Sequence, residues 1–236
     1  MKLSLILPVY NPAESWADMV LTKSKELKAV YPDIDFEAIV INDGSVNSNF
    51  TDGKRKIQSA SVKLIEYAPN KGKGEALRTG VRASSGDIII YTDIDFPYTI
   101  DSMSSIIRSL RDEKKNVVIG IKDQSYYDHV PPLRRFISRV FRFFVRLLLQ
   151  IPTDDTQCGL KGFDQTGKAV FLKTTIGRYL FDLEFIFLAS RDSSISIKTQ
   201  PIKLREDVQF RKMNFGIIRN EAWNFLKILI RSYTNK

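Results

Sequence analysis

Short apolar runs alternate with amphipathic segments through the first half of the chain, and this alternation restricts the fold more than any other feature. The segments between the runs, near 15–30, 73–83 and 100–113, have the apolar spacing of helices. Strands that alternate with helices build a mostly parallel sheet. We therefore predict an α/β fold with a mostly parallel central sheet flanked by helices. Five runs are predicted strands: Leu3–Leu7, Phe36–Ile41, Val62–Ile65, Ile88–Tyr91 and Val117–Ile121.

The polar clusters of the first half fall where predicted strands end. Sheets of this kind bind ligands beyond the carboxyl ends of their strands, so we expect one binding site there. The clusters are Tyr10-Asn11 after the first strand, Asn42-Asp43-Gly44-Ser45 after the second, and Asp93-Ile94-Asp95 after the fourth.

The second half has a different pattern. A segment with Pro131-Pro132 precedes a predicted helix at 133–149 that is both basic and apolar, and a second amphipathic helix is predicted at 217–233. The sequence contains no internal repeat, low-complexity tract or Gly/Ser linker. We therefore expect a single domain over 1–236.

Composition narrows the choice of partners and compartments. A formal net charge of +9 favours an anionic partner, such as nucleic acid, a phosphorylated small molecule or an acidic membrane surface. The single cysteine and single histidine exclude an intrachain disulfide and a Cys/His zinc site, which fits a reducing compartment. No apolar stretch reaches about 18 uninterrupted residues, so we expect no membrane-spanning segment.

The aspartates at the strand ends have two interpretations each. Asp93 and Asp95 suit an oxygen-liganded divalent cation that bridges them to a phosphate, but a solvated turn or helix cap without a ligand is the commoner explanation of a lone Asp-x-Asp. The Asp43 carboxylate suits hydrogen bonds from a base or ribose, but it also suits a simple turn at Gly44. Neither motif decides by itself.

The segment 70–78 combines two glycines and two lysines with the start of a predicted helix. Backbone amides and ammonium groups in this arrangement suit phosphate or sugar oxygens. The Gly-Lys-Ser/Thr ending of a Walker loop is missing. A charged surface turn with a helix cap is the alternative interpretation.

These segments, together with Asp155-Thr-Gln-Cys-Gly159, resemble family 2 glycosyltransferases of the GT-A fold in order and spacing. The resemblance covers about residues 3–190. The string Asp155–Phe163 is similar to a signature of the dolichyl-phosphate glucosyltransferase and dolichyl-phosphate mannose synthase group. The resemblance implies a GT-A-like (Rossmann-like) domain in which 1–122 binds a nucleotide sugar and 123–236 receives the acceptor.

The resemblance also implies roles for individual residues. Mg²⁺ or Mn²⁺ would be held on the donor diphosphate by Asp93 and Asp95. Asp155 and Gln157, with Asp95, would face the sugar and the reaction centre. The nucleotide pocket would contain Pro8, Tyr10, Asn11, Asp43, Lys71 and Lys73, and the donor or acceptor phosphates would contact Lys122, Arg134, Ser138, Arg139 and Arg205.

The chain departs from the family pattern at two places near these residues. Pro12 stands where an acidic residue usually follows Tyr-Asn, with Glu14 two places on. Phe96-Pro97 replaces the polar side chain often found after the second metal aspartate. These departures argue against a third side-chain ligand for the metal. The segment 201–206, which contains Arg205, matches the family only loosely.

Arginines recur at i, i+4, i+7 and i+11 in the predicted helix 133–149 and should form one cationic stripe. A basic amphipathic helix of this kind can lie in a membrane interface, whereas packing on the sheet with a solvated arginine face is the equal alternative. For the helix 217–233 the pattern is more often core packing. The arginines are Arg135, Arg139, Arg142 and Arg146.

The sequence thus predicts an inverting glycosyltransferase that moves a hexose from a UDP- or GDP-sugar to a polyprenyl phosphate. Such an acceptor is already anionic, whereas a glycan hydroxyl, the alternative acceptor, needs a base, for which Asp155 is the candidate. A sugar nucleotidyltransferase is the weaker alternative. No recognised nucleic-acid-binding motif occurs, so we expect no nucleic acid partner. We expect a cytoplasmic protein in peripheral contact with the cytoplasmic face of an anionic membrane.

Overall fold

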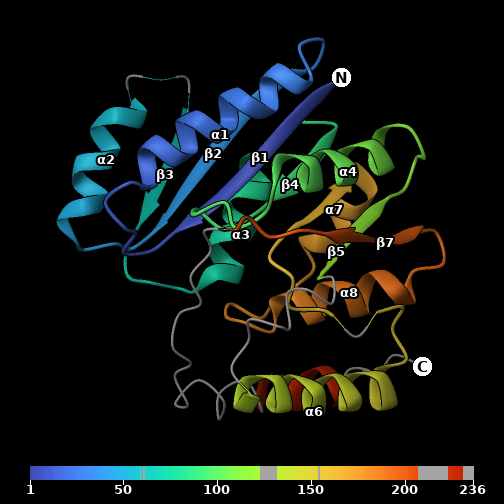
Figure 1. The fold of residues 1–236 in the computed structure, drawn as a ribbon. Coiled ribbons are helices and arrows are strands. Elements are labelled where there is room, and N and C mark those ends of the chain that lie inside the picture. Colours follow the sequence, from blue (N-terminus) through green and yellow to red (C-terminus); the bar gives the residue numbers. More distant parts are fainter. Residues whose placement is uncertain (59, 61, 123–131, 154, 207–222, 231–236) are drawn as a thin grey trace.

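A seven-stranded sheet forms the centre of the computed structural model, with strand order β3-β2-β1-β4-β6-β5-β7 (Figure 1). The structure describes residues 1–58, 60, 62–122, 132–153, 155–206 and 223–230. Of the seven strands, β6 runs antiparallel to both neighbours, and the other pairings are parallel. The strands are β1 (Lys2–Val9), β2 (Asp35–Asp43), β3 (Val62–Tyr67), β4 (Ile88–Tyr91), β5 (Val117–Lys122), β6 (Lys161–Asp164) and β7 (Ile197–Ile202).

Helices cover both faces of the sheet, so the central strands are apolar on both sides. Leu5 and Ile6, which are neighbours on β1, are fully buried in two different clusters on opposite faces. Burial of one such side chain contributes about 1.5 to 3 kcal/mol. One face carries α1 (Trp16–Val30), α2 (Ser48–Gln58) and α4 (Ile100–Arg111), and the other carries α3 (Lys73–Ala83), α7 (Gln165–Phe171) and α8 (Phe181–Arg191).

The alternation of apolar runs predicted the five strands and three of the four described helices of the first half correctly. All five predicted strands are present, each within two residues of its predicted bounds. The helices predicted near 15–30, 73–83 and 100–113 are confirmed as α1, α3 and α4. The predicted α/β architecture is therefore confirmed.

Elements of the second half were missed because their burial hides the usual pattern. Helix α8 is buried at nearly every position from Phe181 to Ala189, so it shows no contrast between a polar and an apolar face. Strand β7 lies at the edge of the sheet, and its Ile-Lys-Thr-Gln-Pro-Ile sequence is mostly half-buried. In the first half, helix α2 was missed for a different reason, because it is strongly polar and contains Gly53.

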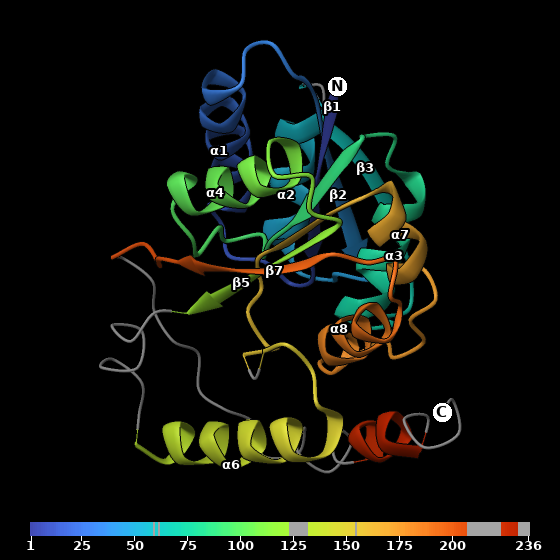
Figure 2. The ribbon, with the colours of Figure 1, turned by 90° about the vertical axis from the view of Figure 1, so that its right-hand side faces the viewer.

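Helix α6 (Pro132–Leu149) and the helical residues 223–230 form a layer below the sheet, beyond α8 (Figure 2). The rings of Phe141 and Phe225 meet edge to face at 5.8 Å. Val145 and Ile228 are buried in the same cluster as α8. The prediction of helix 133–149 is confirmed. Of the predicted helix 217–233, only 223–230 lies within the described residues.

Candidate active site at the strand ends

The strand order reverses between β1 and β4, because β2 and β3 continue on one side of β1 and β4 lies on the other. Sheets of this kind bind ligands at such a reversal, beyond the carboxyl ends of the strands. The backbone there is unusual, since four residues in the loops have positive φ. They are Asn11 (43°), Gly44 (75°), Gly72 (96°) and Phe96 (45°). Backbone in this region of φ is typical of functional loops.

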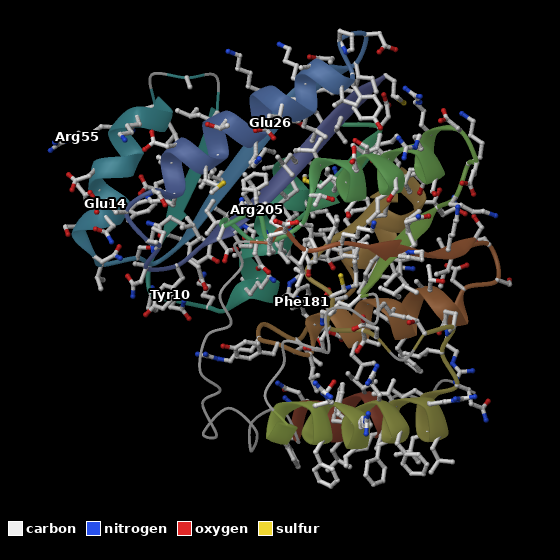
Figure 3. All side chains as sticks on the ribbon, viewed as in Figure 1. Tyr10, Glu14, Glu26, Arg55, Phe181 and Arg205 are labelled. Carbon is white, nitrogen blue, oxygen red and sulfur yellow. The ribbon has the colours of Figure 1, made fainter. Side chains whose placement is uncertain are left out.

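The loops after β1 and β2 hold each other. The Asn11 N–H donates to Ser45 Oγ at 2.9 Å, and the Val46 N–H donates to Asn11 Oδ1 at 2.9 Å. Tyr10 is 51% exposed at the edge of the molecule (Figure 3), and Pro8 is half-buried inside β1. Among these residues of the predicted nucleotide pocket, Tyr10 therefore has an accessible aromatic ring, and Asn11 fixes the loop.

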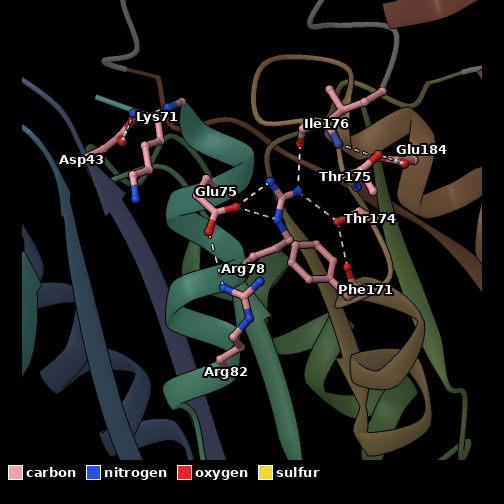
Figure 4. Close-up of polar contacts among 11 residues, drawn as sticks. Asp43, Lys71, Glu75, Arg78, Arg82, Phe171, Thr174, Thr175, Ile176 and Glu184 are labelled. Atoms are coloured by element: carbon pink, nitrogen blue, oxygen red, sulfur yellow. Dashed lines mark hydrogen bonds and ion pairs between the residues drawn. The ribbon is translucent and has the colours of Figure 1, made fainter. Parts of the chain in front are cut away.

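Asp43 ties the end of β2 to the loop before α3 (Figure 4). It is 3% exposed, and its carboxylate accepts a hydrogen bond from the Asn70 side chain at 2.7 Å. It also accepts the backbone N–H groups of Lys71 at 2.7 Å and Gly72 at 2.9 Å. A Cβ at Gly44 would lie 2.8 Å from the Asn70 nitrogen, so this close approach requires glycine. Contact between Asp43 and a nucleotide stays a prediction.

Lys73 and Asp93 join the glycine-containing loop to the end of β4. Lys73 Nζ lies 2.5 Å from Asp93 Oδ1, and the two side chains are 29% and 39% exposed. Burial lowers the pKa of Lys73, but the carboxylates of Asp93, Asp182 and Asp95 raise it by more, so its pKa lies above the ordinary value. The Lys73 ammonium group thus contacts a carboxylate oxygen of Asp93, which is one predicted metal ligand. The other predicted ligand, Asp95, is exposed.

The turn at residues 155–159 approaches the same aspartate. The Gly159 N–H donates to the Tyr98 hydroxyl at 3.0 Å. A Cβ at Gly159 would lie 2.6 Å from Asp93 Oδ2, so a larger residue would push the turn and the aspartate apart. Tyr98 is 4% exposed, which makes it a buried support for the turn. The turn at 155–159 and the Asp93-Ile94-Asp95 motif therefore approach each other closely.

Within this turn, Asp155 holds Lys122. Asp155 Oδ2 accepts the Lys122 N–H at 2.7 Å, and Lys122 Nζ lies 3.5 Å from Oδ1. Gln157 is exposed at the tip of the turn. Cys158 is fully buried, and burial raises the pKa of its thiol, so it acts as a packing residue and not as a nucleophile.

A buried ion pair beneath the turn escaped the sequence analysis. Lys161 is fully buried, and its Nζ donates to Asp182 Oδ1 at 2.7 Å. The same ammonium group donates to the carbonyl oxygens of Thr156 at 3.1 Å and Cys158 at 2.5 Å. The Tyr91 hydroxyl donates to Asp182 as well. A lysine that begins an apolar strand was the signal that could have revealed this network.

Arg78 and Glu184 hold the segment 174–177 against the start of α3 (Figure 4). Arg78 donates to Thr174 Oγ1 at 3.2 Å and to the Ile176 carbonyl at 2.9 Å. Glu184, which is 2% exposed, accepts the Ile176 N–H at 2.8 Å. These residues, which the sequence analysis also missed, join the glycine-containing loop to the second half of the chain.

The remaining predicted phosphate contacts are Arg205, which follows β7, and three residues of α6. The Arg205 N–H donates to the Pro97 carbonyl at 2.9 Å, but Nη1 of its guanidinium lies 3.1 Å from Met19 Sδ on α1 (Figure 3). The others are on α6, in the layer below α8 (Figure 2). There Ser138 is half-buried and Arg139 exposed, and the side chain of Arg134 lies outside the described residues.

The layer formed by α6 and residues 223–230 has a large apolar surface, which we call the apolar face. Its members are 42% to 64% exposed, and such patches are uncommon on soluble proteins. The predicted arginine stripe is divided, because Arg139 and Arg146 are exposed whereas Arg135 and Arg142 are half-buried. The apolar face comprises Phe136, Phe143, Phe144, Leu147, Trp223, Leu226 and Ile230.

The comparison that decides the family covers the sheet and the site together. Residues 4–168, more than half of the chain, match the sequence model of glycosyl transferase family 2. The chain belongs to glycosyl transferase family 2. This stretch includes the strand-end loops, the Lys73–Asp93 pair and the turn at 155–159.

Similar family 2 sequences include the dolichyl-phosphate beta-glucosyltransferases of Drosophila melanogaster and Dictyostelium discoideum. Each is 28% identical over 80% of this chain, and the matches cover 63% and 62% of the relatives' own lengths, so the chain spans less than two thirds of either. Among solved structures, glucosyl-3-phosphoglycerate synthase of Mycobacterium tuberculosis with Mn²⁺, UDP-glucose and phosphoglyceric acid shares the fold. Its TM-score is 0.67 at 15% identity, over 98% of this chain and 79% of the other.

The carboxylates of this family 2 site fit a hard divalent cation. In the described part of the chain, no three His, Cys, Asp or Glu side chains are grouped so as to hold a metal ion. Asp93 nevertheless attracts a cation, as its contact with the Lys73 ammonium shows, and carboxylate oxygens are the ligands that Mg²⁺ and Mn²⁺ prefer. Two aspartates with the diphosphate oxygens of a donor would complete such a site.

Among the helices that the structure describes, none has both the length and the apolar character to cross a bilayer.

Proposed function

We propose that this chain is an inverting hexosyltransferase that moves a sugar from a UDP- or GDP-linked donor to a polyprenyl phosphate of the dolichyl type. The observation that carries the proposal is the approach of Gly159 to Asp93, which brings the signature turn onto the strand-end carboxylates. The relatives named dolichyl-phosphate beta-glucosyltransferase support the same acceptor class.

In this proposal the first half, 1–122, binds the donor. Tyr10 offers an exposed ring to the nucleobase, and Asp43 shapes the loop that carries Lys71 and Lys73. Lys73 begins α3, where the positive end of the helix dipole also favours a diphosphate, and the Lys71 ammonium group lies over the Tyr67 ring. Asp93 and Asp95 would hold Mg²⁺ or Mn²⁺, which supplies charge neutralisation to the departing diphosphate.

The second half, 123–236, presents the acceptor. The oxygen of a phosphate monoester is anionic at pH 7, so attack on the anomeric carbon opposite the diphosphate needs positioning and charge neutralisation more than a base. Lys122, oriented by its two contacts with Asp155, is a cation next to the turn. Gln157 would face the sugar, and Arg134, Ser138 and Arg139 would meet the acceptor phosphate.

Transfer to a glycan hydroxyl is the second candidate function. A hydroxyl must lose its proton during attack, and Asp155 is a carboxylate positioned in the turn that reaches Asp93. In the structure both Asp155 oxygens contact Lys122. This arrangement favours a role in orienting Lys122 over a role in accepting a proton.

The apolar face supports a lipid acceptor. Exposed aromatic and aliphatic side chains beside the exposed Arg139 and Arg146 suit a helix pair that lies in the headgroup region of an anionic membrane. Each basic residue near such a surface contributes about 1 kcal/mol at moderate ionic strength. Peripheral attachment would place the acceptor phosphate near α6.

The proposal is tested by offering the protein Mn²⁺, a panel of UDP- and GDP-hexoses, and a polyprenyl phosphate in mixed micelles. We expect one donor to yield a sugar-lipid in the organic extract, with the anomeric configuration opposite to that of the donor. A donor that is consumed only when a glycan is supplied would instead support the second candidate. No product with any donor or acceptor would refute both.

A further inference from the structure

We propose that Lys161 is a positioning residue of the transfer reaction, because its buried ammonium group fixes the turn that presents Gln157 to the sugar. The inference rests on the proposed function of the site. Lys161 itself is fully buried and contacts the inner side of the turn.

The contacts of Lys161 account for its whole hydrogen-bonding capacity. An ammonium group has three N–H donors, and here they meet the Thr156 carbonyl at 3.1 Å, the Cys158 carbonyl at 2.5 Å and Asp182 Oδ1 at 2.7 Å. The two carbonyls belong to the residues on either side of Gln157. The backbone of the turn is thus held from below on both sides of the exposed side chain.

Burial of this charge argues for a role beyond packing. A buried ion pair is often no more stabilising than apolar side chains of similar volume, so stability alone does not require a lysine at the start of β6. What an apolar residue cannot do is donate to two inward-facing carbonyls. The Lys161 side chain converts a turn that would otherwise bury unsatisfied oxygens into a defined shape.

The same turn is fixed on its other side by the donor half. Tyr98 accepts the Gly159 N–H, and Gly159 approaches Asp93 so closely that a Cβ would lie 2.6 Å from Oδ2. Asp182, in the first turn of α8, receives Lys161 and the Tyr91 hydroxyl together. Loss of the Lys161 contacts would therefore let the turn shift relative to Asp93, and a shift of about 1 Å can reduce turnover about 100-fold.

The test compares a variant that removes both charges of the buried ion pair with a variant that removes only the carboxylate. Lys161→Met combined with Asp182→Asn leaves no unpaired charge but removes the donors to the turn. Asp182→Asn alone keeps Lys161 and an acceptor for it. We expect the double variant to bind nucleoside diphosphate within about threefold of wild type while kcat falls about 100-fold, and the single variant to keep kcat within about fivefold.

Glu37→Gln is the control, because Glu37 accepts hydrogen bonds from Ser4 and Ser85 near the amino ends of β1 and β2, away from the carboxyl ends that form the site. It should lower stability without changing kcat. A folded double variant with near-normal kcat would overturn the inference, and so would an equal loss in Asp182→Asn alone. Should the double variant not fold, Lys161→Gln with Asp182→Asn keeps two of the three N–H donors on a shorter side chain. This variant is expected to show a kcat between that of wild type and the 100-fold loss, and an unchanged kcat would overturn the inference.

Hydrogen exchange without any substrate separates this inference from the proposed function. Backbone amides at 157–160 should exchange at least tenfold faster in the double variant, while those of β1 keep wild-type rates. If wild type transfers no sugar but the turn loosens in this way, the proposed function is wrong and the structural role of Lys161 stands. If wild type transfers sugar and the turn does not loosen, the inference is wrong.

Discussion

Asp43 positions the loop before α3, because its carboxylate accepts hydrogen bonds from that loop. The sequence placed it in the nucleotide pocket, and the structure shows its carboxylate bound to the loop at 70–72. Hydrogen bonds to a buried charge contribute about 1.5 to 3 kcal/mol each, so Asp43 determines the position of Lys71. Loss of Asp43 should weaken donor binding whether Asp43 contacts the base directly or only positions the loop.

Replacement of Asp43 by alanine should weaken binding of the free nucleoside diphosphate and of the nucleotide sugar alike, by about tenfold or more, because in the proposed function both would contact the released loop. Calorimetric titration in Mn²⁺ measures both affinities. Asp52→Ala, at an exposed position on α2, is the control and should bind normally. Normal diphosphate binding with failure only in sugar transfer would remove Asp43 from the donor half of the site.

Asp95→Asn tests the metal assignment at the same scale. Loss of one carboxylate ligand should reduce turnover by about two orders of magnitude or more and raise the Mn²⁺ concentration needed for half-maximal activity, with an unchanged melting temperature because Asp95 is exposed. Asp112→Asn, at the exposed end of α4, should leave both quantities unchanged. Unaltered activity and Mn²⁺ dependence in Asp95→Asn would refute the assignment.

At the scale of elements, α3 connects the two halves of the site. Lys73 in its first turn reaches Asp93 after β4, and Arg78 one turn later reaches the segment 174–177. Glu75 between them holds the Arg78 guanidinium at 2.7 Å. The charged side chains of α3 therefore determine how the glycine-containing loop meets the second half of the chain.

The stability supplied by Glu75 should depend on pH. Burial raises the pKa of Glu75, but hydrogen bonds and charge from Arg78 and Arg82 lower it by more, so its folded-state pKa lies below 4.5. Its contribution is present above that ordinary pKa and is lost as the pH falls through the folded-state value. Glu75→Gln should lower the free energy of unfolding by about 1 to 3 kcal/mol at pH 7, and the difference should shrink in acid. Urea titrations at several pH values measure it.

A surface glutamate gives the control for that measurement. Glu26 pairs with Lys23 on the outside of α1, and Glu26→Gln should change the free energy of unfolding by about 0.5 kcal/mol or less. An equal, pH-independent loss in Glu75→Gln would show that packing, and not charge, explains the role of Glu75.

A second prediction at the scale of elements concerns the apolar face. Phe143→Ser with Leu147→Ser should release the protein from anionic vesicles and reduce transfer to a long-chain polyprenyl phosphate, because both side chains are about 60% exposed. Val30→Ser, an exposed apolar position on α1, is the control. Transfer to a short, water-soluble isoprenyl phosphate should stay normal, and its loss would place the face in the reaction site and not at the membrane.

At the scale of the whole molecule, the sequence predicted what local patterns determine. Strands buried on both faces read as continuous apolar runs, and polar residues at their ends mark one edge of a parallel sheet, so β1 to β5 and Asp93 were found. Lys161 was not assigned a role, because its partner Asp182 lies 21 residues away on α8, whose uniform burial hides the helix. Contacts between distant segments were predictable only where the parallel-sheet rule or the family resemblance supplied them.

The central claim is that the strand-end site transfers a hexose to a lipid phosphate. Phosphorus NMR of one reaction containing the protein, Mn²⁺, the preferred nucleotide sugar and a polyprenyl phosphate tests it most directly, because every possible product has a distinct phosphorus signal. The account predicts that the monoester signal of the lipid is replaced by a phosphodiester signal while nucleoside diphosphate appears in equal amount. Pyrophosphate in place of nucleoside diphosphate, or nucleoside diphosphate with an unchanged lipid monoester, would contradict it.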